Sequence, residues 1–229
     1  MSFLDLDLFV LMIKEELRLH KSFVGAVGSI FFPVIIFILS FILSLSSPVI
    51  INSMGLYKAI LFLNLGAFFY GFVVGFLGKI GEEVMTRRFG EINLILQLPK
   101  LFPISFRKVM SYFFLKDALF YLFYSIIPFT LGALVSIPIS GFSLSFVVLI
   151  FIMLTVTFML GMSLSFLSSS ISIISSKLLV VFILGIIGVL SLRFIIDDFP
   201  IEQIIFPIGY LENGGFSSFF IPVTLIFLF

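Results

Sequence analysis

The charged side chains of this sequence gather in one stretch, residues 81–116, GEEVMTRRFGEINLILQLPKLFPISFRKVMSYFFLK. Its charged residues are Glu82, Glu83, Arg87, Arg88, Glu91, Lys100, Arg107, Lys108 and Lys116. The spacing predicts a helix over 82–98, ended by two prolines, because opposite charges recur at four-residue intervals and so meet on one face. The apolar residues of that helix fall on the other side. Such a helix is suited to docking a soluble partner, although a solvated helix stabilised by ion pairs shows the same pattern.

Catalytic chemistry has little support in these residues. There is no cysteine, which excludes thiolate metal sites and cysteine nucleophiles. The single histidine, His20, lies near the N-terminus, where we expect a surface role. Asp117 has no acidic partner in another predicted span, and Asp197 and Asp198 are adjacent rather than opposed, whereas an intramembrane protease needs facing groups. We therefore expect no enzyme, no metal site and no cofactor in this chain.

A nucleotide site is equally unsupported. Gly78 and Lys79 are followed by Ile80, and position 73 is valine, so the phosphate-loop pattern fails. Any energy from ATP would have to come from a partner.

Composition indicates an integral membrane protein. Hydrophobic residues make up 61% of the 229 positions and charged residues 11%, against roughly 45–50% and about 25% in soluble domains. The sequence predicts an all-α protein of about six membrane-spanning helices, since a span needs about 20 apolar residues. The predicted spans are 23–45, 59–77, 108–134, 142–164, 178–196 and 216–229. The last is short, about 21 Å of helix.

Several features of these spans carry expectations. Pro33 should kink the first span, Pro128 lies inside the third, and residues 46–56 should form a turn-rich loop. Glycines at 71, 75 and 78 should let another helix approach closely. Lys116 should anchor the third span at the inner interface by extending toward the headgroups. The serines of 163–176 should bond to nearby backbone rather than line a polar path.

Residues 4–21 predict an amphipathic helix that lies in the membrane interface or extends the first span into the cytoplasm. Leu4, Leu8 and Leu11 are assigned to one face, with Leu19 as a further candidate. The other face is assigned the charged residues Lys14, Glu15, Arg18 and Lys21.

The basic residues orient the chain. With the N-terminus in the cytoplasm, eleven of the thirteen basic residues fall inside, and only Lys58 and Arg193 fall near the outside. We therefore expect a multi-pass protein of the cell membrane whose charged stretch is cytoplasmic. Its surroundings are a lipid bilayer, and no nucleic-acid partner is expected.

The charged stretch also resembles that of a known family. An acidic pair, arginines, Gly90 and Glu91, then LILQLP, PISFRKV and Lys116, is similar to the permeases of type-two ABC exporters. The resemblance implies an interfacial helix at 4–21, a coupling helix at 82–98, and a re-entrant or outer helical element before the last span, within 199–215. It also implies a second permease copy, identical or related, and a separate ATPase subunit that binds ATP and Mg²⁺.

By the same resemblance, the ATPase would be contacted by residues of the coupling helix. These are Glu82, Glu83, Arg87, Arg88, Gly90 and Glu91. The sequence leaves the substrate open, although spans with so little charge suit a lipid-like or amphipathic cargo. Two alternatives need no ATPase. One is an ion-coupled carrier or channel, for which Lys116 and Asp117 are the best argument, and the other is a structural membrane subunit.

Overall fold

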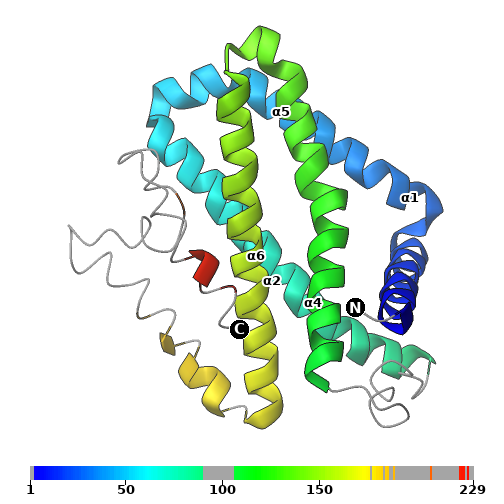
Figure 1. Ribbon diagram of the computed structural model, residues 1–229. Helices are drawn as coiled ribbons and strands as arrows, with labels where there is room; N and C mark the ends of the chain where they lie inside the picture. The colour runs from blue at the N-terminus through cyan, green and yellow to red at the C-terminus, as the bar shows by residue number, and fades with distance from the viewer. Residues whose placement is uncertain are drawn as a thin grey trace. The chain divides into compact units, whose positions relative to one another are not determined.

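The computed structural model describes residues 3–89, 106–175 and 177–182, with positions 184, 185, 188, 207, 222–224 and 226 (Figure 1). Within these residues the regular structure is helical and no strand occurs. The elements are α1 (Phe3–Met54), α2 (Leu56–Phe89), α4 (Phe106–Tyr121), the π-helical turn η1 (Leu122–Ile126), α5 (Ile127–Ser140) and α6 (Leu144–Ile174).

Four helical stretches of the described chain are long and apolar enough to cross a membrane. They are Val27–Met54, Leu56–Gly75, Ser111–Ser140 and Leu144–Ser169. The prediction of a helical membrane protein is thus confirmed to the extent of four such helices. The predicted spans 178–196 and 216–229, and the element before the last of them, lie largely outside the described residues.

The predicted loop at 46–56 is wrong. α1 remains helical to Met54, and only Gly55, with a φ of 85°, separates it from α2. Pro48 suggested a loop, since proline removes the N–H that should bond to the carbonyl of residue 44. The hydroxyl of Ser47 donates to the Ser44 carbonyl at 2.6 Å instead. With that acceptor satisfied, the helix can continue through the proline.

At Pro33 the lost hydrogen bond is also replaced by a side-chain hydroxyl, but this hydroxyl belongs to another helix. Its missing N–H leaves the carbonyl of Ser29 without its helical donor, and the hydroxyl of Tyr124 in η1 donates to that carbonyl. The Tyr124 ring also stacks on Phe32, with centroids 5.2 Å apart. The proline that should weaken α1 therefore helps to join α1 to η1.

By contact density the described chain separates into two compact units, 1–49 with 82–151 and 50–81 with 152–229. In the first unit, α1 packs on α5 through small and polar groups. A Cβ on Gly132 would lie 2.4 Å from the Phe37 carbonyl oxygen. The Ser40 hydroxyl donates to the Phe129 carbonyl, and the hydroxyls of Ser44 and Ser136 bond to each other.

The second unit is built on a close contact between α2 and α6. A Cβ on Gly71 would lie 2.1 Å from the Phe158 carbonyl oxygen, and one on Gly161 would lie 2.1 Å from that of Phe68. Buried Thr157 donates to the side-chain oxygen of Asn64 at 2.7 Å. The expected close approach is confirmed at Gly71 and also holds at Gly75, where a Cβ would lie 2.7 Å from Ser165.

Two of the serines of α6 bond as predicted. Ser163 donates to the carbonyl of Leu160 at 2.9 Å, and Ser168 donates to that of Leu164 at 2.7 Å. These hydroxyls are satisfied by their own helix, so they do not mark a polar path.

Replacing Gly71 by alanine should destabilise the second unit by about 1–3 kcal/mol, because the new methyl group meets backbone and the helices must separate. The measurement is thermal unfolding of the purified protein in detergent. Gly66→Ala on the same helix is the matched control, since nothing lies within 4 Å of its Cβ position. Equal unfolding temperatures for the two variants would contradict the close contact.

Candidate functional site

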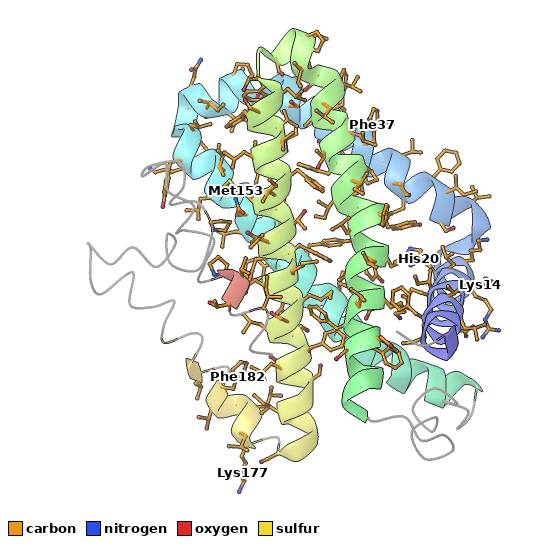
Figure 2. The ribbon with its side chains drawn as sticks, viewed as in Figure 1. Lys14, His20, Phe37, Met153, Lys177 and Phe182 are labelled. Atoms are coloured by element: carbon orange, nitrogen blue, oxygen red, sulfur yellow. The ribbon has the colours of Figure 1, made fainter. Side chains whose placement is uncertain are left out.

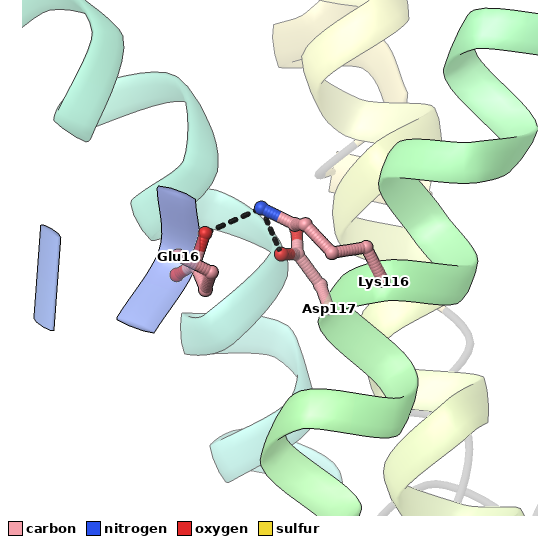
Figure 3. Close-up of polar contacts among 3 residues, drawn as sticks. All are labelled: Glu16, Lys116 and Asp117. Carbon is pink, nitrogen blue, oxygen red and sulfur yellow. Dashed lines mark hydrogen bonds and ion pairs between the residues drawn. The ribbon is translucent and has the colours of Figure 1, made fainter. Parts of the chain in front are cut away.

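Three charged side chains meet between α1 and α4 in the first unit (Figure 3). Lys116 and Asp117 are consecutive residues of α4, and each is only 6% exposed. The Lys116 ammonium lies 2.8 Å from an Asp117 carboxylate oxygen and also donates to the carboxylate of Glu16, on α1. One ammonium therefore serves two carboxylates, that of the next residue and one that is 100 residues away along the chain.

The charge balance of this cluster is uneven. Two carboxylates and one ammonium carry a net charge of −1 when all are ionised. Burial makes an unpaired charge costly, so each carboxylate depends on the same cation. The ring of Phe113, whose centroid lies 5.4 Å from the Lys116 nitrogen, adds attraction for the cation. Ionisable residues within a membrane span are seldom kept for packing alone, which makes this cluster the candidate site.

A cage of aromatic rings continues the contact one helical turn beyond Glu16. The His20 ring lies 4.7 Å from that of Tyr124 and 5.6 Å from that of Phe120, by centroids. Burial lowers the pKa of His20, and the nearby Glu16 carboxylate opposes that shift. His20 is half-buried, and its ring packs against α4 and η1 rather than standing free of them.

The other contacts on this face of α1 are also with α4. Met12 is buried, and the Phe9 ring lies 6.2 Å from that of Tyr112 on α4, edge to face. Residues 9, 12, 16 and 20 recur at helical spacing, so a single face of α1 packs against α4. The cluster is the one ionic contact within an otherwise aromatic and aliphatic interface among the described residues.

The predicted division of faces in residues 4–21 is wrong for Leu11. This side chain is 61% exposed and lies beside Lys14 and Arg18 rather than on an apolar face opposite them. The buried positions are Met12 and, in part, Glu16. A charged residue thus occupies the packed face because α4 supplies its counter-ion.

The ATPase-contact residues predicted from the sequence fall at the end of α2. Glu82, Glu83, Arg87 and Arg88 belong to its last turns, and for these positions the structure describes the helical backbone alone. Gly90 and Glu91 lie outside the described residues, as does the rest of the predicted coupling helix. α2 runs without a break from Leu56 to Phe89, so the residues between the predicted span, 59–77, and the start of the predicted coupling helix are helical as well.

Lys116 and Asp117 were singled out from the sequence, but the second partner of Lys116, Glu16, was not. The Lys116 ammonium bonds to two carboxylates within the protein rather than extending to headgroups. A signal for Glu16 existed: a lysine several turns inside an apolar helix needs an acidic partner, and residues 12, 16 and 20 share one face. The role of Lys116 as an anchor at the inner membrane interface stays a prediction.

A metal ion has no evident place among these residues. Within the described part of the chain, no group of three or more histidine, aspartate or glutamate side chains could hold one. The cluster can instead pair charges, bind a proton or fix the position of α1 on α4.

Comparison with known proteins adds no identification: no protein-family model, curated protein or solved structure matches this chain.

Removing the shared cation tests the cluster. Lys116→Met should destabilise the protein by about 3–5 kcal/mol, because it leaves two buried carboxylates without a counter-ion. The measurement is unfolding in detergent, with Lys58→Met, at an exposed lysine, as the control. Adding Glu16→Gln and Asp117→Asn to Lys116→Met should recover much of the loss. A loss that these two changes do not relieve would contradict a charge-pairing role.

Proposed function

We propose that the chain is the membrane-spanning permease subunit of an ATP-binding-cassette transporter, most simply an exporter, which works with a separate ATPase subunit. Four apolar helices of spanning length, an N-terminal amphipathic helix and a charged stretch between two of the spans support this proposal. The resemblance of residues 82–116 to type-two exporter permeases gives it its particular form.

The observation that carries the proposal is the continuity of α2. Its 34 residues correspond to about 51 Å of helix, whereas the hydrocarbon core is about 30 Å thick. About 21 Å therefore extends beyond the span, and this extension holds the charged residues from Glu82 to Arg88. A force applied to the charged end would be transmitted along one helix to the membrane.

The mechanism follows from that continuity. In the proposal, ATP and Mg²⁺ bind to the partner ATPase, whose closure would push on the charged ends of two permease copies. Each α2 would carry its packed partner α6 with it, because their backbones touch at Gly71 and Gly161. Rocking of packed helices as rigid bodies would open the path alternately to the two sides. The apolar spans favour a lipid-like or amphipathic cargo.

An ion-coupled carrier is the second candidate, and the buried cluster favours it. Glu16, Lys116 and Asp117 hold one more acidic than basic group, which a transported proton or cation could balance. In the permease proposal the same cluster has a structural task, the attachment of α1 to α4.

Co-purification distinguishes the two candidates. We expect the chain to retain an ATP-binding-cassette ATPase encoded beside its gene when the two are co-expressed. The triple variant Glu83→Arg, Arg87→Glu, Arg88→Glu should lose that ATPase while still inserting into the membrane, because the charges that set its register are reversed.

The matched control is Lys58→Glu, at an exposed lysine predicted to lie on the opposite side of the membrane. The permease proposal would be contradicted if the triple variant still retained the ATPase. It would also be contradicted if the wild-type protein retained none, and either result would favour the carrier.

A further inference from the structure

One face of α1 between residues 9 and 21 has no packing partner within the described chain. Its members share high exposure: Val10, Leu11, Lys14, Leu17, Arg18 and Lys21. Three are aliphatic, with exposed fractions of 39%, 61% and 43% in that order, and three are basic. We call this set the basic-apolar face.

These six residues lie on one side of the helix. At about 100° per residue they fall within an arc of about 120°. Phe9, Met12, Glu16 and His20 fall on the opposite side, which packs against α4. Figure 2 shows Lys14 on the side of α1 away from α4 and His20 on the side toward it. Because Glu16 is held by Lys116, the register of the helix is fixed and the basic-apolar face must point outward.

We propose that the basic-apolar face binds the headgroups of anionic lipids at the membrane surface from which the first span begins. The inference needs no ATPase subunit and holds for a permease or a carrier alike. Exposed aliphatic groups favour burial in the interface, and basic groups among them pair with anionic headgroups.

The position of the face in the chain supports a lipid rather than a protein partner. Lys21 is six residues from Val27, where the first apolar span begins. Gly25 lies between them with φ 80° and ψ 158°, outside helical geometry, so α1 changes direction there. The helix of residues 9–21 therefore precedes the first span and can take a direction different from it.

The charges on this face do not contribute equally. Arg18 is paired with Glu15, an exposed ion pair that reduces its net attraction for an anion. Lys14 and Lys21 are therefore the main headgroup ligands. A lysine near an anionic surface contributes about fivefold in affinity, and the two together about 25-fold.

A single tryptophan can report on the face, because the sequence has none. The full chain carrying Leu17→Trp would be reconstituted in vesicles that contain phosphatidylglycerol and phosphatidylcholine, with bromine atoms on the acyl chains of one lipid at a time. Brominated phosphatidylglycerol should quench the fluorescence several-fold more than brominated phosphatidylcholine at equal mole fraction. Added salt should reduce the difference, since it screens exposed charges.

The variants decide the assignment. Lys14→Gln with Lys21→Gln should abolish the preference, whereas the control pair Lys58→Gln with Lys177→Gln, also at exposed lysines, should keep it. Equal quenching by both lipids in the parent protein would overturn the proposal. Absence of quenching by either lipid would also overturn it, and would indicate that a protein surface covers this face.

Discussion

The first unit depends on the sharing of the Lys116 ammonium between Glu16 and Asp117. A buried ammonium must be paired, and a buried carboxylate must be too, so the three groups have to meet. Glu16 can reach α4 in only one rotation of α1. That rotation places His20 among the rings of Phe120 and Tyr124, and it turns the basic residues of the same helix outward. One ionic contact thus determines both the packed and the exposed surface of the N-terminal helix.

A second constraint is the need to satisfy every backbone carbonyl in an apolar setting. Two prolines in α1 each remove a donor, and each lost bond is replaced, at Ser44 by the hydroxyl of Ser47 and at Ser29 by that of Tyr124. The second replacement comes from a different helix, so a local defect becomes a tertiary contact. Where side chains are small, backbone approaches backbone directly, as at Gly71 and Gly132.

The sequence predicted the elements better than their ends and contacts. Apolar length located four helices of spanning size, and glycine spacing anticipated the close contact at Gly71. The loop at 46–56 was mistaken because turn propensity does not register the hydroxyl that replaces a proline's missing donor. Glu16 was missed because periodicity separates charged from apolar residues, whereas its place on the packed face depends on a counter-ion from a hundred residues away.

The central claim is that the charges of Glu16 and Lys116 hold α1 on α4, and an exchange of these charges tests it most directly. Glu16→Lys and Lys116→Glu would each be measured alone and together by thermal unfolding of the purified protein. Each single change should lower the unfolding temperature, because it replaces the attraction between α1 and α4 at positions 16 and 116 by repulsion between two ammonium groups or two carboxylates. The double exchange should restore most of the loss, since one ammonium again faces two carboxylates. Additive losses in the double variant would contradict the claim.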